Sequence, residues 1–116
     1  MTGVQTCALP ISPRRPALLH GDLWGGNILS NGSRVVGFID PAIYYGHPEA
    51  DLAFSTLFGT LGRAFFERYE SIAGIDDGFF DLRRDIYNLY PLMVHACIFG
   101  GGYRSQALSI IQALGY

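Results

Sequence analysis

Three polar residues of this sequence, Asp22, Asn27 and Asp40, have the types and the order that phosphoryl transfer to an alcohol requires. Such a reaction needs a carboxylate that accepts the proton of the attacking hydroxyl, and it needs hard oxygen ligands that hold Mg²⁺ against the transferred phosphate. Asp22 is a candidate for the base, and the amide oxygen of Asn27 is a candidate metal ligand. Asp40 can be a second ligand if the chain folds back to bring it beside Asn27.

The segment between Asn27 and Asp40 has the pattern of a β-hairpin. Residues 28–30 and 34–39 are rich in apolar, strand-forming side chains, and they flank Asn31-Gly32. Asn-Gly between two such runs is the strongest short-range signal for a hairpin, because both residues tolerate the positive φ of a tight turn. We therefore expect Asn27 and Asp40 to share one Mg²⁺ ion and, through it, to bind the nucleotide.

The spacing His20-x-Asp22-x₄-Asn27 resembles the catalytic loop of protein-kinase-like phosphotransferases. With Leu23-Trp24 and the loop Tyr44-Tyr45-Gly46-His47, it closely resembles the fructosamine kinase (ketosamine-3-kinase) family, part of the aminoglycoside phosphotransferase-like group. The resemblance extends over three stretches: His20-Gly21-Asp22-Leu23-Trp24-Gly25-Gly26-Asn27, residues 40–53 and Phe99-Gly100-Gly101-Gly102-Tyr103. It implies a kinase-like fold and ATP- and Mg²⁺-dependent phosphorylation of a sugar hydroxyl on small-molecule or protein-bound ketosamines, a step in deglycation.

The resemblance also implies roles for single residues. Asp22 is the catalytic base, and Asp40 takes the place of the metal-binding aspartate that follows the catalytic loop in kinases. His20 braces the backbone of the loop, and Trp24 either stacks on the sugar or belongs to the core. Asp51 either hydrogen-bonds the loop or favours the dipole of its own helix. An alternative for Asp22 is that, like Asn27, it merely shapes a turn.

The start of the chain does not fit this domain. Residues 2–11 resemble the conceptual translation of a sequencing adapter, so we expect 1–11 to be non-native and 12–116 to be a C-terminal catalytic lobe. All eight basic residues are arginines, whereas kinases of this group pair the ATP phosphates with a lysine of an N-terminal lobe. We therefore expect the native chain to carry that lobe upstream, and this chain to be inactive alone.

The sequence after Pro48 has a helical period. The spacing of apolar residues predicts four helices. The first covers about 50–61, and the second follows Gly62 and ends at a glycine cap, Gly74. The third covers 77–99, and the last lies around 107–114. The predicted fold class is α+β: a mainly helical lobe with one short hairpin. The helix over 77–99 is apolar around most of its circumference, so we expect it to be central and buried, with His95 and Cys97 in its core.

Composition excludes several classes of function. The net charge of −2 and the scattered charges give no basic stripe for nucleic acid. No apolar run approaches the roughly 18 to 20 residues of a membrane span. The two cysteines, Cys7 and Cys97, are far apart, which argues against a disulfide and favours a reducing, cytoplasmic setting.

Two other functions stay open on the sequence alone. The chain could be a helical binding module that kept the fold without catalysis, or a kinase of the same group for another small alcohol, such as an aminoglycoside or a choline-like molecule. Trp24 and the Tyr-Tyr-Gly-His loop favour the ketosamine interpretation over the latter.

Overall fold

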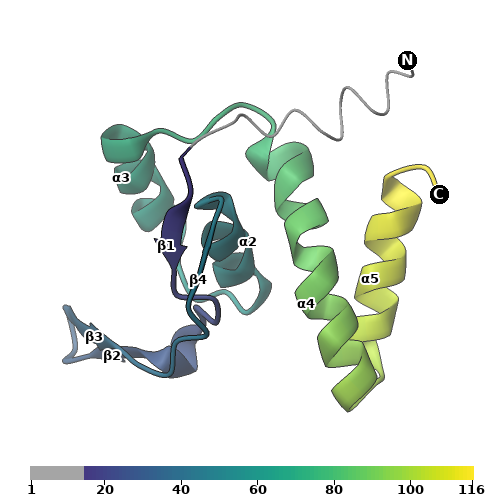
Figure 1. Cartoon of the computed structure of the whole chain (residues 1–116), viewed down its shortest axis with the longest axis horizontal. Helices are drawn as coiled ribbons and strands as arrows, with labels where there is room; N and C mark the ends of the chain where they lie inside the picture. The colour runs from purple at the N-terminus through teal and green to yellow at the C-terminus, as the bar shows by residue number, and fades with distance from the viewer. Residues whose placement is uncertain (1–14) are drawn as a thin grey trace.

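The computed structural model describes residues 15–116, which form two small antiparallel sheets and a group of helices (Figure 1). The predictions for residues 1–11 and for Cys7 lie outside the described residues. In chain order the elements are β1 (Ala17–Leu19), the 3₁₀ turn η1 (Gly25–Asn27), β2 (Ile28–Ser30), β3 (Val35–Phe38), β4 (Tyr44–Gly46), α2 (Glu49–Leu57), α3 (Arg63–Ala73), the π-helical turn η2 (Phe79–Arg83), α4 (Arg84–Phe99) and α5 (Gly102–Ala113).

The hairpin predicted around Asn31-Gly32 is present as β2 and β3. Ile28 pairs with Phe38 and Leu29 with Gly37, and the register shifts by a bulge between Leu29 and Ser30. The hairpin lies away from the helices in Figure 1. The hairpin brings the chain back to the end of η1. This return is what the expected position of Asp40 beside Asn27 requires.

The prediction that residues 44–47 form a loop is wrong for the first three of them. Tyr44–Gly46 is strand β4, which pairs antiparallel with β1 in the register Leu18 to Tyr45 and Leu19 to Tyr44. Tyrosine favours extended backbone, but the partner strand lies far back in the sequence, so no local pattern reveals the pairing. The β1–β4 ribbon lies beside α2 (Figure 1).

The helices differ from their predicted extents at their ends. α2 stops at Leu57 instead of Leu61, and Gly59 follows with φ of +62°, a conformation that only glycine adopts without strain. α3 ends at Ala73 and is capped by Gly74, with φ of +75°, as predicted. The helix predicted over 77–99 starts as η2 and continues as α4.

The core lies between α2 and the start of the long helix. Leu52, Ala53 and Phe79 are buried there, with Phe66 and Tyr69 of α3 packed against them.

The long helix is central as predicted, because α4 packs against both α2 and α5. The prediction that it is buried is wrong, because apolar residues along it, such as Tyr90, Ile98 and Phe99, are exposed. Its Cys97 is exposed, and not a core residue as predicted.

A buried ion pair joins the start of α2 to the start of the long helix. The guanidinium of Arg83 donates from Nε and Nη2 to the two carboxylate oxygens of Glu49, both at 2.8 Å. Its Nη1 and Nη2 also donate to the main-chain carbonyls of Asp77 and Asp76, at 2.7 and 3.0 Å. The hydrogen bond to Glu49 raises the pKa of Arg83 further above its ordinary value. The two charges are therefore matched, and four of the five guanidinium N–H groups are hydrogen-bonded inside the fold.

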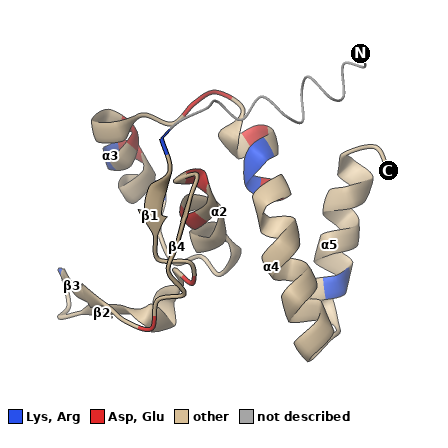
Figure 2. Ribbon diagram, in the orientation of Figure 1, with Lys and Arg blue, Asp and Glu red and all other residues tan. Residues whose placement is uncertain are grey.

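Charged side chains are scarce on α5 and on most of α4. Beyond Asp85, the rest of α4 and all of α5 carry one charged side chain, Arg104 (Figure 2). This helix pair is therefore held by apolar and neutral polar contacts. None of the described helices is long and apolar enough to span a bilayer.

Removing Arg83 should destabilise the fold strongly. In Arg83→Leu the carboxylate of Glu49 stays buried without its partner, which should lower the free energy of unfolding by about 3–5 kcal/mol. Arg63→Leu is the matched control, because Arg63 pairs with Glu67 on the exposed surface of α3, and such pairs contribute little. Urea denaturation followed by circular dichroism measures both variants. Equal urea midpoints for the two variants would contradict the conclusion that the buried pair of Arg83 and Glu49 stabilises the fold.

Candidate active site

The loop between β1 and η1 is fixed to α2 by one carboxylate. Asp51, on the first turn of α2, accepts hydrogen bonds from the backbone N–H groups of His20 (2.7 Å) and Gly21 (3.0 Å). Gly21 has φ of +84°, and a Cβ at this position would overlap the main-chain carbonyl of Ala42. Residue 21 must therefore be glycine for the loop to reach Asp51.

His20 connects the loop to the segment after the hairpin through its carbonyl and its Nε2, and it braces the loop itself through its Nδ1. Its carbonyl accepts from Ala42 N–H (2.8 Å), and its Nδ1 accepts from Asp22 N–H (3.2 Å). Because Nδ1 is an acceptor, the ring proton is on Nε2, which donates to the Ile39 carbonyl at 2.8 Å. A ring engaged on both nitrogens has no free position for proton transfer, so its role here is to hold the backbone.

Asn27 is buried directly beside the candidate base. Its Nδ2 donates to the Asp22 carbonyl (2.9 Å) and to Asp22 Oδ2 (3.0 Å). Because both partners are acceptors, the amide orientation is fixed, and Asn27 Oδ1 faces away from Asp22. Oδ1 of Asp22 makes no hydrogen bond within residues 15–116. One oxygen on each side chain is thus left for a substrate or a metal.

Asp40 follows a residue that is hydrogen-bonded to Asn27, and it has a constrained backbone. The preceding residue, Ile39, donates its N–H to the Asn27 carbonyl at 2.9 Å. Asp40 itself has φ of +49°, in the left-handed region, which costs a residue with a Cβ about 1–2 kcal/mol. The hydrogen bonds of Ile39 and Ala42 on either side hold it in place. Its side chain is exposed.

The oxygens of Asn27 and Asp40 suit Mg²⁺ better than zinc. Magnesium takes oxygen ligands and keeps several waters, so two protein ligands suffice when a phosphate supplies the others. Zinc needs three or four protein ligands, with His and Cys prominent among them. Within residues 15–116 there is no cluster of three His, Cys, Asp or Glu side chains able to hold a metal. The residues present therefore fit the metal of phosphoryl transfer.

A cavity of about 720 Å³ opens beside Asp22 and is lined mainly by aromatic rings. Trp24 is 42% exposed and contacts Phe58 of the α2 end edge-on. A Cβ at Gly26 would collide with the indole, so the glycine gives the ring its room. The structure thus places Trp24 on a cavity wall next to the candidate base, and not in the core.

His95 of α4 lines the same cavity, a position that the sequence analysis missed. Its Nδ1 is 2.7 Å from the Pro91 carbonyl, so Nδ1 carries the proton and Nε2 is left as an acceptor. The ring packs among Phe58, Phe99 and Tyr103, with centroids 5.2–5.8 Å away. It is half-buried and is not part of a helix core. Its distance of 73 residues from Asp22 left no local signal in the sequence.

Two tyrosines behind the loop are held in their neutral form. Burial, followed by the negative charge of Asp51, raises the pKa of Tyr44. Burial and the charge of Glu49 raise the pKa of Tyr87, which stacks on His47. Tyr44, Tyr87, His47 and Asp51 line a smaller cavity of about 370 Å³. No proton leaves these phenols near neutral pH, so the candidate base remains Asp22.

Known kinases are similar in sequence to this chain. The chain is 46% identical over 97 residues to a chloroplastic protein-ribulosamine 3-kinase from Arabidopsis thaliana, a match that covers 84% of this chain and 29% of the relative. It is 42% identical over 99 residues to the ketosamine-3-kinase of Mus musculus, covering 85% of this chain and 31% of the relative. The chain therefore spans about a third of the length of these relatives.

Solved structures share the fold. A protein from Haemophilus somnus, provisionally assigned as a fructosamine-3-kinase, superposes with a TM-score of 0.80 at 28% identity, over 97% of this chain and 39% of its own. One from Thermobifida fusca with the same assignment gives a TM-score of 0.76 at 38% identity, over 95% and 38%. Residues 5–115 match the family model described as fructosamine kinase. This chain belongs to the fructosamine kinase family.

Proposed function

We propose that this chain is the part of a ketosamine kinase that supplies the base, the metal ligands and the sugar pocket. The observation that carries the proposal is the pairing of Asp22 with Asn27. The Asn27 amide fixes the Asp22 carboxylate through Oδ2 and leaves Oδ1 free beside the aromatic cavity. A carboxylate held in this way can accept the proton of a substrate hydroxyl as that hydroxyl attacks the γ-phosphorus of ATP.

Asn27 and Asp40 would hold Mg²⁺ in this reaction. When bound, the metal neutralises negative charge on the phosphates of ATP. The contribution of the protein is to present the two oxygens on a backbone that hydrogen bonds hold in place. The hydrogen bond from Ile39 N–H to the Asn27 carbonyl and the left-handed backbone of Asp40 support this role.

The aromatic cavity would bind the sugar part of the substrate. Trp24 offers an exposed ring face to the C–H groups of a sugar, and Nε2 of His95 offers an acceptor to one of its hydroxyls. The names of the relatives, a protein-ribulosamine kinase and a ketosamine kinase, support a ketosamine as the molecule whose hydroxyl is phosphorylated.

The ATP-binding lobe would cover an exposed apolar surface. Leu18, Val36, Phe38 and Ile43, around β1 and the hairpin, are each 58–61% exposed. Leu19, the neighbour of Leu18 on β1, is buried and is not part of this surface. The chain also contains no lysine to pair with the ATP phosphates. Both observations support the proposal that catalysis needs residues supplied from outside this chain.

We predict that residues 12–116 alone have no ATP-dependent activity towards a fructosyl-amine. Positioning supplies most of the catalysis in phosphoryl transfer, and the part that positions ATP is missing. A chimera that joins these residues to the N-terminal two thirds of the Arabidopsis relative should be active. Transfer of ³²P from labelled ATP measures both proteins, with an aminoglycoside and choline as comparison substrates. Robust turnover by the chain alone, or a folded, ATP-binding chimera without activity, would overturn the proposal.

Asp22→Asn in that chimera should lower kcat by about 10²–10⁴, because the amide cannot accept the hydroxyl proton. Its affinity for ATP and its melting temperature should change little. Asp81→Asn is the matched control, since Asp81 is exposed on η2. Asp22 is not the base if the two variants turn over at similar rates.

Asp40→Asn in the chimera should raise the Mg²⁺ concentration needed for half-maximal rate. Loss of a residue that only hydrogen-bonds a metal ligand typically weakens metal binding about 10–100-fold. Loss of a direct ligand should weaken metal binding at least as much. The KM for the ketosamine should stay constant at saturating Mg²⁺. A Mg²⁺ dependence identical to that of the unaltered chimera would rule out Asp40 as a ligand.

A further inference from the structure

The turn between α4 and α5 shapes one end of the aromatic cavity. Its Gly100 and Gly101 have φ of +67° and +58°, which a residue with a Cβ adopts only with strain. This turn places the ring of Tyr103, at the start of α5, 6.2 Å from the ring of Phe99 and 5.2 Å from that of His95. The rings of His95 and Phe99 are 5.8 Å apart. The three rings therefore contact one another.

These rings end a row of aromatic side chains along the cavity. The row starts at Trp24, two residues after the candidate base, where the indole lies 6.3 Å from the ring of Phe58. Phe58 lies 5.5 Å from His95, and from there the row continues to Phe99 and Tyr103. All five rings line the same cavity. The row thus connects the candidate base to the turn between the last two helices.

The rings at the far end of the row are accessible to a ligand. Phe99 is 69% exposed, and Tyr103 and His95 are half-buried. A molecule in the cavity can therefore reach them without a change in the fold.

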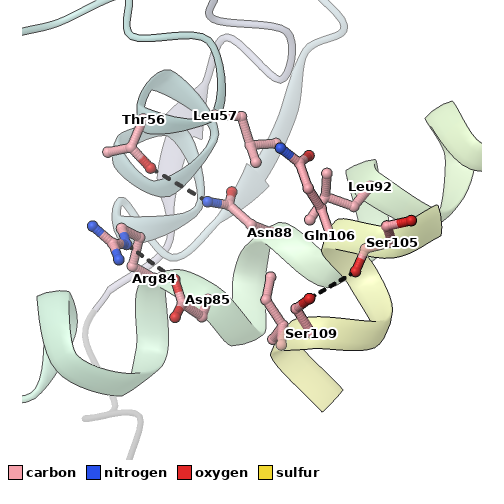
Figure 3. Close-up of a pocket in the computed structure, with 10 residues that line it drawn as sticks. Thr56, Leu57, Arg84, Asp85, Asn88, Leu92, Ser105, Gln106 and Ser109 are labelled. Carbon is pink, nitrogen blue, oxygen red and sulfur yellow. Dashed lines mark hydrogen bonds and ion pairs between the residues drawn. The ribbon is translucent and has the colours of Figure 1, made fainter. Parts of the chain in front are cut away.

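The aromatic cavity carries a negative charge without a positive one. Asp22 is the only Asp, Glu, Lys or Arg among the described residues that line it. The electron-rich faces of aromatic rings also attract cations. A second cavity, of about 480 Å³ between α2, α4 and α5, differs in this respect, because its Arg84 and Asp85 pair at 3.1 Å (Figure 3). The aromatic cavity therefore favours a cationic ligand.

We propose that Phe99 and Tyr103 bind the protonated amine of the substrate through cation–π contacts. This inference rests on the proposed function and names the group of the ketosamine that the cavity selects. An alkylamine holds its proton near neutral pH. With the reacting hydroxyl at Asp22 and the sugar on Trp24, the amine lies farther along the row of rings. His95 contacts both rings and keeps Nε2 for a sugar hydroxyl.

Two ligands of the same shape and different charge test the inference. In 1-deoxy-1-(methylamino)-D-fructose the amine is cationic, and in 1-O-methyl-D-fructose a neutral ether oxygen replaces it. Trp24 is the only tryptophan of the 116-residue chain, so its fluorescence reports binding in the cavity. The amine should bind about tenfold more tightly than the ether. Equal affinities, or no saturable signal with the amine, would overturn the inference.

Variants of the two rings locate the contact. Phe99→Leu and Tyr103→Leu should each weaken binding of the amine about threefold and leave binding of the ether unchanged. Tyr103→Phe keeps the ring and should bind the amine as the unaltered chain does. Tyr90→Leu is the matched control, since Tyr90 is an exposed ring of α4 that does not line this cavity. The inference fails if the leucine variants bind the amine normally, or if Tyr103→Phe weakens binding as much as Tyr103→Leu.

Kinetics of the chimera described above separate this inference from the proposed function. Tyr103→Leu should raise the KM for the amine about threefold with little change in kcat, because the ring contributes to binding and not to the chemistry. An active chimera with equal KM values for amine and ether would overturn the cation–π contact and leave the kinase assignment intact. A folded, ATP-binding chimera without activity would overturn the proposed function, whereas selective binding of the amine by the chain would still support the contact.

Discussion

The geometry of the candidate active site depends on the carboxylate of Asp51. Its two oxygens accept the backbone N–H groups of His20 and Gly21, and the backbone of the loop is thereby fixed to a helix whose other side is in the core. From His20 the hydrogen bonds continue to Ile39, Ala42 and Asp22. Asp40 and Asp22 are thus held by the same histidine, although the hairpin separates them in the sequence.

The first turn of α2 holds two parts of the molecule at once. Asp51 binds the loop, and Glu49, two residues earlier, binds Arg83 at the start of the long helix. The loop carries Asp22 and Trp24, and the long helix carries His95. The aromatic cavity lies between these two parts, so its shape depends on two carboxylates on a single turn.

The sequence predicts the local features of this site and misses those that join distant segments. Asn31-Gly32 reveals the hairpin because turn chemistry is local, and the spacing of Asp22 and Asn27 reveals the loop. Nothing near Glu49 indicates Arg83, and nothing near Tyr44 indicates its pairing with Leu19, because these contacts close long stretches of chain. Cys97 appeared to be a core residue because an apolar helix surface has the same pattern whether or not another part of the protein covers it.

The separation of Asp51 from the loop has a consequence for how the protein is made. His20 precedes Asp51 by 31 residues, and Glu49 precedes Arg83 by 34. Contacts between residues so far apart in the sequence form late, because closing the intervening chain costs conformational entropy before the contact contributes any stability. During synthesis the hairpin can form as soon as it leaves the ribosome, whereas the loop before it stays unattached until α2 follows. We expect nascent chains that end before α2 to expose this loop to proteases and chaperones.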